Sequence, residues 1–263
     1  MTPATASAAP ATQSGKGARI ALALAWTGVG LALACGIAEL LAGPGYRLGW
    51  WRLGSGIQIM VWSATSDLAA VLLTFAAAIL AWKYGARRAL VVGAMGLVLA
   101  LIVAGPPLYQ WRMADQVPSI HDISTDTGNP PRYVAVMPLR KGAQNSTDYS
   151  ADVAEKQKKA YPDIAPATLD VPPAQALQRA ERAALAMGWD IVAVASEDLR
   201  IEATDTTLLF GFKDDIVIRI AASGRGSRVD VRSLSRIGGS DLGVNANRIR
   251  AFMKQLDAAK AGA

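Results

Sequence analysis

Three long stretches almost free of charged residues constrain this chain more than any other feature. They cover residues 20–41, 57–82 and 89–111, and a polar region follows from residue 113 to residue 263. A hydrocarbon core about 30 Å thick needs about 20 apolar residues, because an α-helix rises about 1.5 Å per residue. The sequence therefore predicts a membrane-embedded front part that carries one soluble domain.

Composition divides the chain into four segments. Residues 1–18, rich in Ala, Thr, Ser and Pro, are expected to form a disordered cytoplasmic tail. Residues 19–111 are expected to form a three-helix membrane region. Residues 112–148 contain several prolines and should be extended rather than helical. Residues 149–263 are expected to form an α+β periplasmic domain.

Most of the net positive charge lies beside the apolar stretches. Up to Trp111 the chain carries seven basic and two acidic residues, a balance of +5, whereas the formal charge of the whole chain is +6. Basic residues beside membrane spans set topology, so the high isoelectric point does not indicate nucleic-acid binding. Nucleic acid is excluded as a partner on this ground, and the expected partners are membrane lipid and a protein of the cell envelope.

The positions of these basic residues predict the orientation. With the N-terminus in the cytoplasm, the inner segments carry five of them and the first outer loop carries two. Three crossings then place the polar region outside. The expected location is a bacterial inner membrane, with several passes and a periplasmic C-terminal domain. The inner basic residues are Lys16, Arg19, Lys83, Arg87 and Arg88, and the outer ones are Arg47 and Arg52.

Asp67 is an acid within the second apolar stretch. It lies about 24 Å of helix from Lys83, so it is placed inside the span. A carboxyl group at that depth is costly and suggests a functional site, with Glu39 and Ser63 as candidate neighbours. If the span tilts or starts late, Asp67 instead anchors the helix in the headgroup region. Both interpretations are compatible with the sequence.

The polar region has the pattern of an α+β domain. A helix is predicted from Pro173 to Gly188, and a second from about residue 244 to 259, each with one apolar face. Between them lie four alternating, β-branched segments, with a hairpin turn at residues 223–226. The fold class is therefore α+β, a helix, four-stranded antiparallel meander and helix, with both helices on one sheet face. The predicted strands cover residues 191–195, 199–204, 213–221 and 227–233.

Strand alternation divides the sheet into an apolar face and a charged face. Ile201, Ile218 and Val231 are among the residues predicted to face the helices. The charged face is ordinarily a solvated surface with cross-strand ion pairs. A ligand groove is the alternative, if the extended segment folds across this face. The residues predicted on the charged face are Arg200, Glu202, Asp215, Arg219, Arg228, Asp230 and Arg232.

Four strings of this region, in order, resemble a known family. They cover residues 120–133, 201–207, 211–219 and 229–250. Together they are similar to the domain of unknown function 1499 family over residues 118–256. The resemblance implies a bacterial envelope or organellar setting and implies no activity, substrate or cofactor.

The first of these strings offers His121, Asp122 and Asp126, an imidazole and two carboxyl groups within six residues. Such a set could form part of a metal site or an acid–base pair. Neighbouring residues on an extended segment point to opposite sides, and the chain has a single histidine. Structural hydrogen bonding within the loop is therefore the alternative interpretation.

Two further sets could bind ions. Asp214 and Asp215 could hold a divalent cation, or could pair with Arg219 or Arg232. Arg232 and Arg236 precede Gly238-Gly239-Ser240 and the last helix, as an anion site would require. Capping of that helix by Ser240 or Asp241 is the alternative.

The sequence favours a membrane-anchored periplasmic binding or assembly module of unknown ligand, with no cofactor and no metal. An envelope enzyme using His121, Asp122 and Asp126, with Arg132 as an anion clamp, is one alternative, although an enzyme is less favoured than a binding module. A small membrane factor acting through Asp67 is the other. The candidate ligand-binding residues are His121, Asp122, Asp126, Arg132, Glu202, Asp214, Asp215, Arg219, Arg232 and Arg236.

Overall fold

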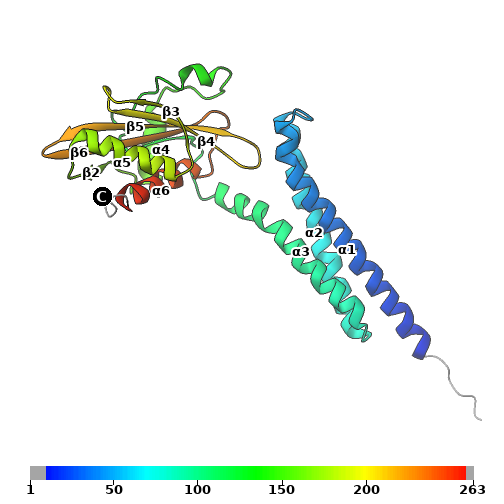
Figure 1. Ribbon diagram of the computed structural model, residues 1–263. Helices are drawn as coiled ribbons and strands as arrows, with labels where there is room; N and C mark the ends of the chain where they lie inside the picture. Colours follow the sequence, from blue (N-terminus) through cyan, green and yellow to red (C-terminus); the bar gives the residue numbers. More distant parts are fainter. Residues whose placement is uncertain (1–9, 259–263) are drawn as a thin grey trace, which may run out of the picture. The chain divides into compact units, whose positions relative to one another are not determined.

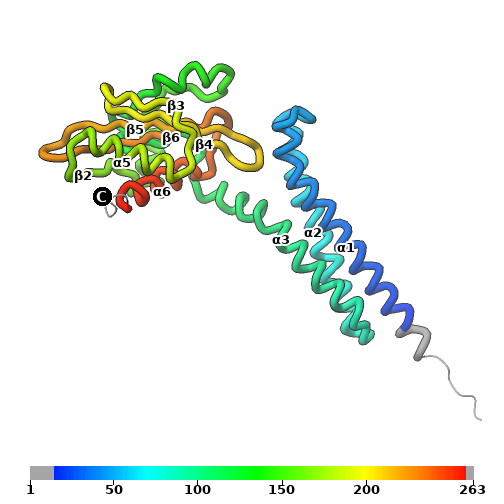
Figure 2. Tube along the Cα trace, viewed as in Figure 1, coloured from blue at the N-terminus to red at the C-terminus, as the bar shows by residue number. Residues whose placement is uncertain are grey.

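The computed structural model describes residues 10–258 and divides the chain into two compact units, Met1–Arg112 and Met113–Ala263. Each unit has its own helices and core, and each is described by itself. The described part of the first unit consists of helices joined by short turns, and the second unit is built around an antiparallel sheet (Figures 1 and 2).

The first unit consists of α1 (Pro10–Arg47), α2 (Leu53–Lys83) and α3 (Arg87–Ala114). All three are long and apolar enough to cross a membrane. Helix α1 begins at Pro10, so the expectation of disorder for residues 1–18 is wrong from residue 10 onward. Proline is well suited to the first turn of a helix, and the alanines around it favour helix. Residues 1–9 lie outside the described residues.

Small residues form the contacts between these helices. Ala32, Ala70 and Ala100 form one buried cluster. A Cβ on Gly28 would lie 2.5 Å from the Thr74 side chain, so the backbones of α1 and α2 approach closely there. Large apolar side chains such as Trp62 remain exposed on the outside of the helices. Small residues inside and large apolar residues outside are typical of membrane helices, which gain stability from close packing.

The second unit confirms the predicted α+β fold. Helices α5 (Pro173–Ala186) and α6 (Val244–Ala258) pack on one face of a sheet, as Figure 1 shows. The strand order of this sheet is β1-β6-β5-β4-β3. The four predicted strands form the antiparallel meander, joined between β5 and β6 by the expected tight turn. These strands are β3 (Asp190–Ala195), β4 (Arg200–Thr206), β5 (Lys213–Ser223) and β6 (Gly226–Ser235).

Four short elements were not predicted. Strands β1 (Asp122–Ser124) and β2 (Ala167–Leu169) both pair with β6. Helix α4 (Ala151–Ala160) and the 3-10 helix η1 (Met137–Arg140) precede β2. Helix α4 buries a single polar residue, Gln157, so it has no apolar periodicity to reveal it.

The predicted strand register is confirmed by burial. Ile201, Ile218 and Val231 are fully buried in the core between the sheet and the helices. Ile218 lies opposite both Ile201 and Val231 across the strands, so the three side chains stack on the same face. Along each of these strands, alternate side chains therefore point toward the helices and away from them, as the sequence pattern predicted.

The opposite face of the sheet is not the solvated surface that the charge pattern favoured. The segment 122–148, called here the covering segment, lies across it on the side away from α5 and α6 (Figures 1 and 2). Glu202 and Asp215 are 0 % exposed, and Asp230 and Arg232 are 1 % and 3 % exposed. Buried charges persist only when they are paired or hydrogen-bonded, so each of these charged side chains must have polar partners on this face of the sheet.

Candidate functional site

The covering segment is held first by a small apolar cluster. Tyr133 and Val136 pack against Val217 of β5 and Leu234 of β6. The Tyr133 hydroxyl donates to the backbone carbonyl of Asp215 at 3.0 Å, which satisfies its polar end. This cluster brings the backbone of residues 133–136 directly over the strands that carry the charged residues.

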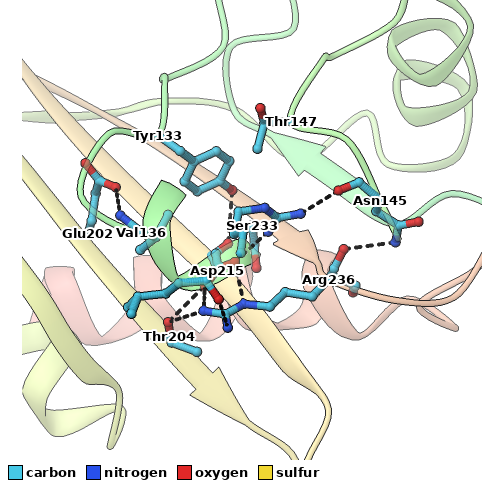
Figure 3. Close-up of polar contacts among 12 residues, drawn as sticks. Tyr133, Val136, Asn145, Thr147, Glu202, Thr204, Asp215, Ser233 and Arg236 are labelled. Atoms are coloured by element: carbon cyan, nitrogen blue, oxygen red, sulfur yellow. Dashed lines mark hydrogen bonds and ion pairs between the residues drawn. The ribbon is translucent and has the colours of Figure 1, made fainter. Parts of the chain in front are cut away.

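Glu202 of β4 fixes the backbone of the covering segment. Its carboxylate accepts hydrogen bonds from three consecutive backbone N–H groups, those of Val134, Ala135 and Val136, at 2.9 to 3.0 Å. The contact with Val136 is visible in Figure 3. Arg200 donates to the same carboxylate at 2.8 Å. Successive N–H groups that converge on one anion form a strong site for a negative charge, which here belongs to the protein itself.

Asp215 of β5 is the centre of a second polar cluster. One carboxylate oxygen accepts from Arg140 of η1 at 2.5 Å, and both accept from Arg236 at 2.9 and 2.7 Å. The Thr204 hydroxyl donates to Asp215 at 2.9 Å, as Figure 3 shows. The expectation that Asp214 and Asp215 pair with Arg219 or Arg232 is wrong. The two aspartates lie on opposite faces of the strand, and Asp214 pairs with Arg248 of α6 at 2.5 Å.

Arg232 of β6 forms a second deeply buried ion pair on this face. It contacts Asp122 of β1 through two hydrogen bonds, at 2.9 and 2.6 Å, and the exposed fractions of the two side chains are 3 % and 4 %. Its guanidinium group lies over the rings of Tyr133 and Tyr149. It also donates to the backbone carbonyls of Pro131 and Thr147. Arg232 therefore joins both ends of the covering segment to the sheet.

The charge state of Asp122 is set by two opposed effects. Burial raises the pKa of Asp122 above its ordinary value, although the hydrogen bonds and the charge of Arg232 act to lower it. The two side chains therefore form two parallel hydrogen bonds, but removing both charges from water costs free energy. Removing one partner of such a pair is strongly destabilising, whereas replacing both by apolar residues is often neutral or stabilising.

Asp126 begins a third group, nearer the solvent. Arg219 donates to Asp126 and to Asp230 at 3.0 and 2.9 Å, and Arg228 makes the same two contacts at 3.0 and 2.9 Å. Burial alone raises the pKa of Asp126, but hydrogen bonds from the Asn129 backbone and from Arg219 outweigh it and hold the pKa below its ordinary value.

A pocket of about 200 Å³ opens between this group and the covering segment. Arg132, Arg200 and Arg219 line it, together with Asp198. Arg200 and Arg219 face each other across β4 and β5, an arrangement of like charges that costs energy unless something compensates it. Arg132 is exposed and has no hydrogen-bond or ion-pair partner among the described residues. The remaining lining residues are Asn129, Pro130, Pro131 and Val217.

The other predicted site residues have internal contacts. His121 is half-buried, and its Nδ1 lies 3.3 Å from the Gly239 carbonyl oxygen. Asp122 and Asp126 pair with different arginines, so the three residues do not converge on one site. At the start of α6, Asp241 accepts from the backbone N–H groups of Gly243 and Asn245, which is the capping interpretation. Within the part of the chain that the structure describes, no group of three His, Cys, Asp or Glu side chains could hold a metal ion.

Several residues of these clusters were not among the candidates. Arg140 lies in an aperiodic segment and gives no sequence signal. Arg248 lies on the buried face of α6, against Asp214 and Ser233. Arg200 was assigned to the charged face but not to a site. The sequence feature that could have identified Arg200 as a site residue is its predicted position opposite Arg219. Two arginines at paired strand positions are unfavourable unless an acid or a ligand compensates their charge.

The polar domain has the sequence pattern of a family. Residues 122–256 match the family model described as "Protein of unknown function (DUF1499)", which confirms the expected resemblance. The match covers the covering segment, the whole meander and most of α6. The chain belongs to this family. No curated protein matches the chain.

Proposed function

We propose that this protein is a membrane-anchored binding module whose polar domain takes an anionic group in the arginine pocket. Three helices able to cross a membrane would anchor it. The observation that carries the proposal is the pocket itself, in which Arg132, with no side-chain partner among the described residues, lies beside Arg200 and Arg219. Planar guanidinium groups bind carboxylate and phosphate through paired hydrogen bonds, so either group fits.

Neighbouring contacts hold two of the arginines before any ligand arrives. Glu202 and Asp198 hold Arg200 at 2.8 and 2.9 Å, and Arg219 donates to the Asn129 carbonyl at 3.0 Å. Because Glu202 is also satisfied by three backbone N–H groups, it does not depend on Arg200 alone. A ligand would therefore meet guanidinium groups that need little reordering, which lowers the entropic cost of binding.

Substitution of Arg132 tests this proposal. The full-length chain in detergent micelles would be titrated calorimetrically with inorganic phosphate and, separately, with succinate. Arg132→Gln is expected to weaken binding of the anion that the pocket prefers about tenfold or more, because a charge-assisted hydrogen bond contributes about 1.5–3 kcal/mol. Arg225→Gln is the matched control, since Arg225 is an exposed arginine in the β5–β6 turn. Equal affinities in the two variants, or no binding by the wild type, would contradict the proposal.

We further propose that the domain lies on the periplasmic side of a bacterial inner membrane, where its partner would be an anionic component of the envelope. Five basic residues on the N-terminal segment and the α2–α3 turn support a cytoplasmic location for those parts. A reporter enzyme that is active only in the periplasm is expected to be active when fused after Ala263. The same reporter inserted at Gly85 should be inactive. The reverse pattern would place the domain in the cytoplasm.

A further inference from the structure

Asp67 is the most unusual side chain in the helical unit. It lies near the middle of α2, about 21 Å from Leu53 and about 24 Å from Lys83. It is 0 % exposed, and neither carboxylate oxygen has a hydrogen-bond partner among the described residues. An unpaired carboxylate in an apolar medium is too costly to persist in the charged form, so this group requires a proton or a ligand.

A second acid from α1 lies in the same region. Gly28 of α1 packs against Thr74 of α2, and Ala32 and Ala70 share a buried cluster, so these antiparallel helices bring Glu39 near the level of Asp67. The Oε1 atom of Glu39 is also buried without a partner in the described structure. Cys35, one turn earlier on α1, is also buried. Two acids on neighbouring helices therefore lie at similar depth, and each has a buried oxygen atom without a partner among the described residues.

Among the described residues, no hydrogen bond or ion pair joins a basic side chain to the buried oxygen atoms of these two acids. Between Arg52 and Lys83, Asp67 is the only charged residue of α2, and the buried Ser63 is one turn away. On α3 the charged residues lie at the two ends, and its one ionisable side chain between them, Tyr109, is exposed. At low dielectric, two neighbouring carboxyl groups with no cation cannot both be ionised, and they titrate as a coupled pair.

Helix α3 adds backbone acceptors at the same level. A Cβ on Gly36 of α1 would lie 3.0 Å from the side chain of Val103, which places that part of α3 beside the turn of α1 that contains Cys35. Pro106 and Pro107 lie inside α3 and have no N–H group, so the carbonyls of Ile102 and Val103 lose their helical donors. Free carbonyls near buried acids are typical of proton and ion pathways in membranes.

We propose that Asp67 and Glu39 form a proton-binding site within the membrane helices, in which the two carboxyl groups hold a proton that exchanges with solvent. The site binds the proton on one carboxyl oxygen and releases it from there, so no other reactant is needed. It is independent of the arginine pocket, because it uses different residues of a different unit.

Infrared spectroscopy of the full-length chain tests this inference. The chain would be placed in nanodiscs of phosphatidylcholine and phosphatidylglycerol, in potassium buffer at neutral pH. The wild type is expected to show the C=O stretching band of a protonated carboxylic acid, shifted after transfer to D₂O. Asp67→Asn should lose this band, and Glu39→Gln should change the pH at which it disappears. Asp152→Asn, at an exposed acid of α4, should leave the band unchanged.

Labelling the aspartate carboxyl carbons with ¹³C provides a test without substitution, which matters if Asp67→Asn does not fold. The label should shift the band if Asp67 carries the proton. Absence of the band, or a band that persists in a folded Asp67→Asn variant, would overturn the inference. So would a band that never shifts in D₂O, which would indicate an inert buried acid. Loss of the band on replacing potassium by sodium would instead identify a cation site.

Discussion

Replacing Arg232 by methionine is expected to lower the free energy of unfolding of the polar domain by about 3–5 kcal/mol. The substitution leaves the carboxylate of Asp122 buried without its cation. It also removes the donors to the carbonyls of Pro131, within the covering segment, and of Thr147, near its end. Urea unfolding of residues 113–263, followed by circular dichroism, measures the loss.

A double variant distinguishes the loss of stability caused by the broken ion pair from the loss caused by poorer packing. Asp122→Asn combined with Arg232→Met should recover much of the lost stability, because it removes the charge that burial makes unfavourable. Arg250→Met is the matched control. Its pair with Asp163 has exposed fractions of 35 % and 54 %, so its loss should cost less than about 1 kcal/mol. Equal losses for Arg232→Met and Arg250→Met would contradict the assignment of a buried pair.

Replacing Glu202 by alanine is expected to cost about 3 kcal/mol or more, because three backbone N–H groups and Arg200 lose a shared acceptor. Glu202→Gln keeps one acceptor oxygen, so its loss should be smaller. The same urea titration compares the two variants. A Glu202→Ala domain as stable as the wild type would show that the covering segment is held by its apolar cluster alone.

The sheet and its two helices were predictable because their signals are local. Residues such as Ile201, Ile218 and Val231 alternate with charged neighbours, and this period of two specifies both the strand and its buried face. The turn at Gly224 also follows from local chemistry, since its φ of 59° is a conformation that glycine adopts readily. Long apolar stretches identified the three membrane helices for the same reason.

The covering segment was not predictable beyond its extended character. Its position depends on contacts between distant residues, such as the pair of Asp122 with Arg232, which are 110 residues apart. No periodicity encodes such a contact. The charge pattern of the sheet was visible in the sequence, but whether that face is solvated or buried depends on a segment with no apolar stripe. Asp67 was recognised because a lone acid in an apolar helix is a local anomaly.

Internal acid–base contacts hold the covering segment on the sheet and so form the arginine pocket. Hydrogen exchange at the backbone amides of Val134, Ala135 and Val136 in the full-length chain tests it most directly. These amides lie in no strand or helix, yet they donate to Glu202. The account predicts strong protection in the wild type and its loss in Glu202→Ala. Exchange in the wild type at the rate of an unstructured peptide would contradict it.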